Sequence, residues 1–126
     1  MGKPLTQRQK YDRQITEAQV QRVITDALDT CGWLWHHETD SRKSKRGFPD
    51  ICAIHPRTGA LLFLELKREL GRVNPEQEAW ISALAKHDAG MEPRPYQTGP
   101  WHGFRAAVVR PSNLDLAVQL IQKWAR

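Results

Sequence analysis

Three charged residues lie in stretches that otherwise resemble buried strands. Asp50 comes directly before ICAIH (51–55), and Glu65 and Lys67 end the run ALLFLELK (60–67). Charged side chains are rarely buried unless they are paired or hold a metal ion. Their position therefore indicates a site for chemistry and not a plain apolar core.

The connection between the two runs predicts that Asp50 and Glu65 face each other. Residues 56–59 read Pro-Arg-Thr-Gly, which is typical of a hairpin turn. A four-residue loop places Ile54 opposite Leu61 and, with the count continued, Asp50 opposite Glu65. Opposed side chains on paired strands have Cβ atoms about 4.5–5.5 Å apart, so two carboxylates there repel each other. A register shift of one residue would break this pairing.

A divalent cation would compensate the repulsion. Mg²⁺ prefers oxygen ligands and is commonly held by one or two carboxylates together with water and substrate phosphate. Lys67 shares a strand face with Glu65, where it could orient an attacking water or meet developing negative charge. A simpler interpretation is that Lys67 only neutralises Glu65. His36 and His37 are adjacent and have no partner cluster for zinc, and neither G-x-S-x-G nor a glycine-rich phosphate loop occurs.

A cluster of cations precedes the first carboxylate. The formal net charge is +5, and residues 42–46 read RKSKR directly before Gly-Phe-Pro-Asp. On charge alone a solvated loop is the simpler interpretation, but the neighbouring carboxylates favour contacts with nucleic-acid phosphates. The candidate contact residues are Arg42, Lys43, Lys45 and Arg46.

The elements that must position these residues follow from periodicity and capping. We expect helices over 16–31, over 74–90 and after Pro111, and strands within 32–39, 50–55, 60–67 and 104–110. The first two helices begin with a cap residue followed by glutamine three positions later. This order predicts an α/β fold with a mixed sheet flanked by helices. Residues 1–15 are polar and expected to be partly disordered, and 16–126 form one domain.

Other features bound the class of protein. No apolar stretch approaches the ~20 residues of a membrane span, and the N-terminus lacks a secretory apolar core. Cys31 and Cys52 are predicted to be reduced core thiols, which favours a cytoplasmic location. In the Pro-rich connection over 91–103, Trp101 and His102 could stack on nucleic acid, although packing is the simpler interpretation.

The spacing of the charged residues resembles a known signature. G-F-P-D, fourteen residues and then E-L-K is similar to the PD-(D/E)xK nuclease motif. With Glu17 on the preceding helix and N-P-E-Q-E-A-W opening the following one, residues 17–109 resemble the VRR-NUC family. The resemblance implies a restriction-endonuclease-like core similar to archaeal Holliday-junction resolvases. The family occurs as stand-alone proteins of phages and bacteria, which tend to be homodimers that cut branched DNA, and as the nuclease module of a Fanconi-associated repair enzyme.

The resemblance also implies roles for individual residues. Asp50 and Glu65 would hold Mg²⁺ or Mn²⁺, with the main-chain carbonyl of Leu66 as a third ligand. Lys67 matches the catalytic lysine.

One further acid, Glu17, and one amide, Gln77, complete the implied site. Glu17 would reach the metal directly or through water, although a first-turn glutamate also simply suits the helix dipole. Gln77 would border the site. The connection over 91–103 is longer than the family pattern leads us to expect.

The leading hypothesis is a metal-dependent endodeoxyribonuclease acting in a bacterial or phage-infected cell, selective for branched DNA such as Holliday junctions. One alternative is a non-catalytic module that binds nucleic-acid structures. Another is a restriction-type endonuclease, for which 126 residues leave little room to read bases.

Overall fold

The computed structural model describes residues 2–38, 45–90 and 104–126, and their side chains except those of 87–90. The helices are α1 (Gln7–Gln14), α2 (Glu17–Thr30), α3 (Pro75–Gly90) and α4 (Leu114–Trp124), with a short 3₁₀ turn η2 (Pro111–Asn113). The strands are β1 (Leu34–His37), β2 (Ile51–Ile54), β3 (Leu61–Leu66) and β4 (Phe104–Val109). The predicted order of elements is confirmed from α2 onward.

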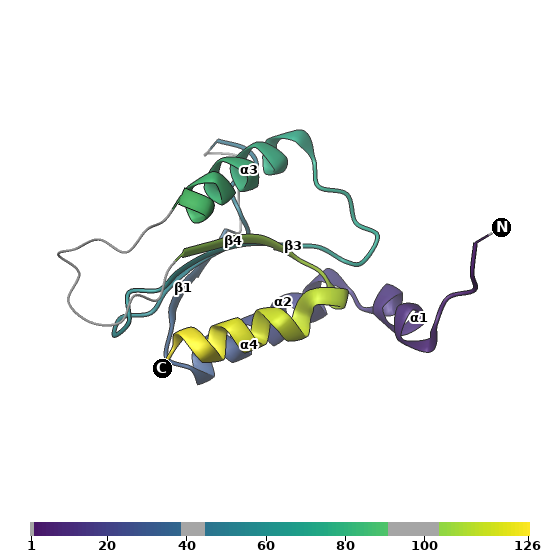
Figure 1. The fold of residues 1–126 in the computed structure, drawn as a ribbon, viewed down its shortest axis with the longest axis horizontal. Helices are drawn as coiled ribbons and strands as arrows, with labels where there is room; N and C mark the ends of the chain where they lie inside the picture. The colour runs from purple at the N-terminus through teal and green to yellow at the C-terminus, as the bar shows by residue number, and fades with distance from the viewer. Residues whose placement is uncertain (1, 39–44, 91–103) are drawn as a thin grey trace.

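The four strands form one mixed sheet in the order β1-β2-β3-β4. The first three strands are antiparallel, whereas β4 lies parallel to β3. A parallel neighbour requires a crossover, and α3 lies within it. Helices α2 and α4 cover one face of the sheet and α3 covers the other (Figure 1). The predicted α/β class with a helix-flanked mixed sheet is therefore confirmed.

The hairpin between β2 and β3 has the predicted register. Ile54 pairs with Leu61, and the His55 N–H donates to the Ala60 carbonyl oxygen at 2.9 Å. The buried His55 ring stabilises the loop, because its Nδ1 accepts from the Arg57 N–H at 3.2 Å while its Nε2 donates to the Cys31 carbonyl at 3.0 Å. The sequence of the two strands did not indicate that the His55 side chain stabilises the loop.

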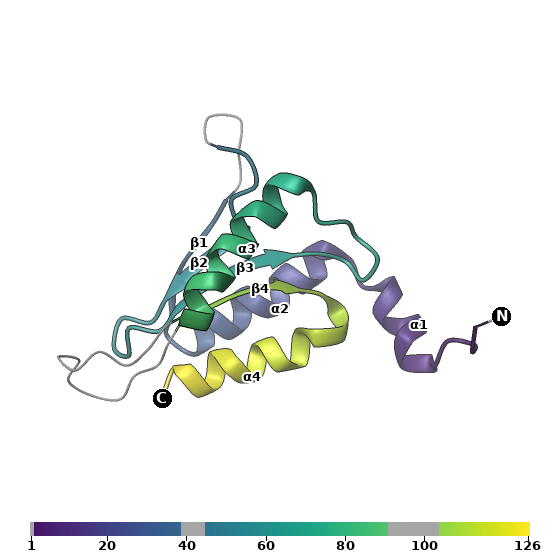
Figure 2. The same cartoon turned by 45° about the horizontal axis from the view of Figure 1, so that its top comes forward.

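Helices α2 and α4 lie on the same side of the sheet (Figure 2), and the main core lies between these helices and the sheet. Val20, Ile24 and Leu28 present the buried stripe of α2, and they pack in one cluster with side chains of β3 and with Ile121 of α4. Val23 lies three residues after Val20, at the spacing that predicts a place on the same stripe, but it is 42% exposed. The buried face of α2 is therefore narrower than predicted.

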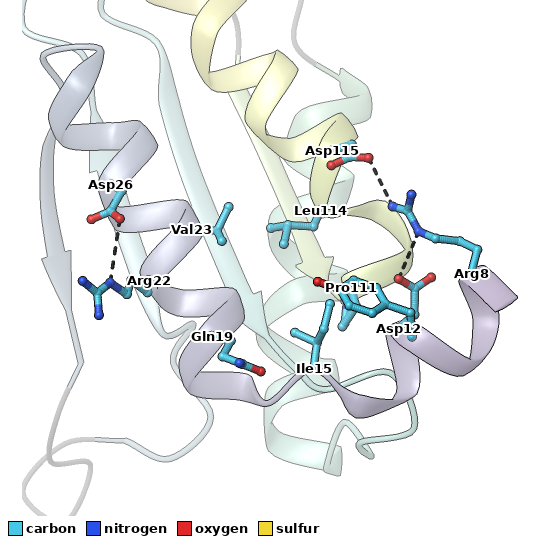
Figure 3. A pocket seen from close by; sticks show the side chains of 11 residues that line it. Arg8, Asp12, Ile15, Gln19, Arg22, Val23, Asp26, Pro111, Leu114 and Asp115 are labelled. Atoms are coloured by element: carbon cyan, nitrogen blue, oxygen red, sulfur yellow. Dashed lines mark hydrogen bonds and ion pairs between the residues drawn. The ribbon is translucent and has the colours of Figure 1, made fainter.

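Helix α1 lies in the segment for which the sequence predicts partial disorder. Its signal is a capping box between Thr6 and Gln9, the same pattern that starts α2. Arg8 donates a hydrogen bond to Asp12 within α1 at 3.2 Å. It also donates to Asp115 of α4 at 3.2 Å, which connects the two helices (Figure 3). Between α1, α2 and the start of α4 lies a pocket of about 540 Å³. None of the candidate site residues lines this pocket.

The remaining sequence predictions concern membranes and thiols. Within the described residues, no helix is long and apolar enough to cross a membrane. Cys31 and Cys52 are both free, but each is half-buried and not fully enclosed in the core. Burial raises the pKa of the Cys52 thiol. The connection over 91–103, with Trp101 and His102, lies outside the described residues.

Candidate active site

Asp50 lies at the point where β2 begins. Its main-chain carbonyl accepts from the Glu38 N–H at 2.8 Å, which extends the β1–β2 pairing by one residue. Its side-chain Oδ2 accepts from the Leu66 N–H at 2.7 Å. The Asp50 carboxylate is therefore held against the end of β3 by a main-chain donor, which fixes its orientation.

Glu65 is almost completely buried, with 1% of its surface exposed. One oxygen, Oε1, accepts from the Gln77 side-chain amide at 2.8 Å and lies 3.7 Å from the Lys67 Nζ. The other oxygen, Oε2, is buried and has no hydrogen-bond partner among the described residues. A buried polar atom without a partner is rare in folded proteins and often marks a place for an ion or water.

The electrostatics of Glu65 reflect this environment. Burial, followed by the negative charge of Asp50, raises the pKa of the Glu65 carboxyl from 4.5 to about 8. The Lys67 ammonium acts in the opposite direction, and Glu17 raises this pKa by the smallest contribution. The Lys67 ammonium therefore does not suffice to keep both carboxyls ionised below about pH 8, whereas a bound divalent cation would.

Gln77 links the site to helix α3. Its backbone N–H donates to the Asn74 side chain at 2.8 Å, and its Oε1 accepts from the Asn74 N–H at 3.0 Å. Because this capping box engages the amide oxygen, the amide nitrogen is left to donate to Glu65. The same side chain thus begins the helix and orients a carboxylate of the site.

Gly47 sets the distance between the loop before Asp50 and α3. Its φ is +91°, and a Cβ built on it would lie 2.4 Å from the Glu76 carbonyl carbon. Only glycine tolerates both the left-handed backbone and this contact. The next residue, Phe48, packs edge-on against Phe63 of β3 and Trp80 of α3, with ring centroids 6.0 and 5.1 Å apart. This packing places the Gly-Phe-Pro-Asp loop between the sheet and α3.

Arg110 organises the turn that follows Lys67, a role the sequence did not reveal. Its Nη1 donates to the carbonyls of Arg68, Glu69 and Gly71 at 3.0, 3.0 and 2.7 Å. The Lys67 N–H donates to the Val109 carbonyl directly before Arg110, at 2.9 Å. An arginine after a buried strand is a weak sequence signal, because its acceptors lie about forty residues earlier.

The other predicted residues are less closely engaged. Glu17 is exposed on the first turn of α2 and influences Glu65 only through its charge. Lys45 and Arg46 are exposed beside α3, where the Trp80 indole donates to the Arg46 carbonyl at 3.2 Å. Arg42 and Lys43 lie outside the described residues. Across the described ranges, no group of three His, Cys, Asp or Glu side chains is arranged to hold a metal ion.

Comparisons with known proteins agree with this arrangement. The helix-flanked mixed sheet is an α/β fold consistent with a VRR-NUC nuclease domain, and the family model described as "VRR-NUC domain" matches residues 5–110. The chain therefore belongs to the VRR-NUC domain family, and this membership implies a nuclease that acts on DNA.

The fold is also similar to that of a solved structure titled "VRR_NUC domain". The two chains share 21% sequence identity with a TM-score of 0.56, and the match covers 83% of this chain and 97% of that one. A comparison with curated proteins gives no match of similar significance. The family match begins at residue 5 and so includes α1, which the resemblance seen in the sequence did not.

Proposed function

We propose that this protein is a divalent-metal-dependent endodeoxyribonuclease whose site is formed by Asp50, Glu65 and Lys67. The observation that carries the proposal is the buried Oε2 of Glu65, which has no partner among the described residues although the negative charge of Asp50 lies beside it. A buried carboxylate beside a second, partly buried one is unfavourable as a purely structural feature.

The residues present fit a hard divalent cation. Asp50 uses Oδ2 for the Leu66 N–H, which leaves Oδ1 to a cation, and Glu65 offers Oε2. The Leu66 main-chain carbonyl is the proposed third oxygen. Mg²⁺ and Mn²⁺ both favour oxygen donors, and Mg²⁺ in a site that also binds phosphate is usually held by one or two protein carboxylates.

Each side chain has a role that follows from its contacts. When bound, the metal would supply a Lewis acid for the scissile phosphate and for a nucleophilic water. Lys67, with 14% of its side chain exposed, can reach both Glu65 and a substrate, so it orients the water and stabilises negative charge that develops on the phosphate. Gln77 holds Glu65 through Oε1, and Glu17 would reach the metal directly or through a water.

The substrate contacts are proposed from charge. Lys45 and Arg46, with Arg42 and Lys43, would bind phosphates in a salt-dependent manner that is largely independent of sequence. Branched DNA such as a Holliday junction is the proposed substrate and a homodimer the proposed assembly, both on the basis of the sequence resemblance.

Cleavage of a panel of labelled DNAs tests the proposal. We expect the wild-type protein to cut duplex, flap or four-way-junction DNA with Mg²⁺ or Mn²⁺ and to be inactive with EDTA. Asp50→Ala should lose cleavage by at least about 100-fold and retain DNA binding, since it removes a metal ligand and not a phosphate contact. Asp26→Ala, which changes an acid that is 72% exposed, is the matched control. Full cleavage by Asp50→Ala would refute the site.

A further inference from the structure

We propose that a depression between the loop at Lys45–Arg46 and helix α3 binds one unpaired nucleotide of the DNA substrate. This inference rests on the proposed function and specifies its substrate. The depression has a volume of about 320 Å³. Its lining residues are Lys45, Arg46, Glu76, Ala79, Trp80 and Ala83.

The floor of this nucleotide pocket is a fixed aromatic ring. The Trp80 indole N–H donates to the Arg46 carbonyl at 3.2 Å, and Phe48 contacts the ring edge-on at 5.1 Å with an interplanar angle of 82°. These contacts hold the ring in place before any ligand binds. Ala79 and Ala83 lie on the same side of α3 and are too small to cover it. A half-buried, immobilised tryptophan beside alanines is suited to stacking on a nucleobase.

The charges around the nucleotide pocket match a nucleotide and not only a base. Lys45 and Arg46 are exposed and cationic, so they can bind the phosphate attached to a stacked base. Glu76 is exposed and also lines the pocket, so it can accept a hydrogen bond from an exocyclic amino group.

The nucleotide pocket and the candidate active site share their supporting residues. Arg46 is followed by Gly47, which contacts the Glu76–Gln77 peptide, and Gln77 in turn donates to Glu65. A nucleotide bound at Trp80 would therefore be a near neighbour of the phosphate at the carboxylates. A base must leave its duplex to stack on a protein ring, so the pocket selects single strands, flaps and the unpaired positions of branched DNA.

Equilibrium binding with EDTA present tests the inference without cleavage. The probes are a fluorescein-labelled oligodeoxycytidylate, whose bases carry an exocyclic amino group, and a labelled hairpin duplex with no unpaired stem residues, measured by fluorescence anisotropy. Trp80→Ala should weaken binding of the single strand about 10-fold, since base–aromatic stacking is worth ~1–3 kcal/mol, and should leave duplex binding unchanged. Trp80→Phe should retain most of the affinity for the single strand.

Two variants avoid disturbing the packing of Trp80. Ala83 is exposed on α3, so Ala83→Gln fills the pocket without charge and Ala83→Glu fills it with charge, and both residues suit a helix. Each should lower the single-strand affinity by about the same factor as Trp80→Ala. Lys86→Glu, an exposed change on α3 outside the pocket, should leave the ratio of single-strand to duplex affinity unchanged.

The inference would be overturned if Ala83→Glu left the ratio of single-strand to duplex affinity unchanged, whether neither affinity falls or both fall by the same factor. The two proposals fail independently. If the wild-type protein cuts no DNA, the nuclease assignment is contradicted. If Ala83→Gln still lowers the single-strand affinity of that protein, the nucleotide pocket is nevertheless supported.

Discussion

Replacing Glu65 with glutamine should stabilise the metal-free protein while abolishing its function. The Glu65 carboxyl is buried, and its pKa is raised from 4.5 to about 8 by burial and by the charge of Asp50. Glutamine has almost the same shape and can still accept from Gln77. Its amide nitrogen would occupy the position of the unpartnered Oε2, where it can donate to the Asp50 carboxylate.

The sign of the effect follows from proton linkage. Between pH 4.5 and about 8 the folded protein retains a proton on Glu65 that the unfolded chain has released, so the free energy of unfolding falls as pH rises. The contribution is complete below pH 4.5 and lost above about pH 8. One pKa unit is equivalent to about 1.4 kcal/mol, so ionised Glu65 costs a few kcal/mol, up to about 5.

Urea unfolding followed by circular dichroism measures this difference. With EDTA, wild type should lose stability between about pH 4.5 and pH 8 relative to Glu65→Gln, and the variant should be more stable above about pH 8 by a few kcal/mol. Added Mg²⁺ should raise the stability of wild type alone, because only wild type binds it. Glu76→Gln changes an exposed glutamate and should follow wild type. Parallel pH profiles for wild type and Glu65→Gln would refute the reasoning.

Two further predictions concern the supports of the site. Gly47→Ala should destabilise the protein by more than about 2 kcal/mol, because it adds a backbone clash at 2.4 Å to a left-handed φ. Gly59→Ala should cost only about 1 kcal/mol, since Gly59 has a φ of +76° but open space around it. Thermal unfolding of the two variants compares these costs, and equal losses would contradict the contact with α3. Arg110→Ala should lower kcat about 10- to 100-fold with little change in KM, because it releases the turn after Lys67, and Arg110→Lys should restore part of the rate. Steady-state cleavage kinetics test this, and a change confined to KM would contradict a positioning role.

The strands and their register were predictable because the signals are local. A four-residue loop with proline and glycine connects two apolar runs, and strand side chains alternate, so the chain's own spacing relates Asp50, Glu65 and Lys67 to one another. The caps of α2 and α3 were predictable for the same reason, since a cap and its partner lie three residues apart.

Local signals also misled where the outcome depends on packing. The periodicity of α2 places Val23 and Glu17 near its apolar stripe, yet both are exposed because α4 and the sheet cover a narrower face of that helix. In the same way, Trp80 fits the apolar stripe of α3, but it is half-buried and lines the nucleotide pocket.

By itself, the sequence determined which residues could do chemistry and on which strands they lie. Only the tertiary structure decided that Glu65 is buried with one oxygen that has no partner among the described residues, that Gln77 reaches it from α3, and that Arg110 holds the turn after Lys67. Chain neighbours determine the strand pairing of a hairpin and the cap of a helix. Burial and the contacts of a carboxylate depend instead on elements distant in sequence, whose approach here requires Gly47 to lie directly against α3.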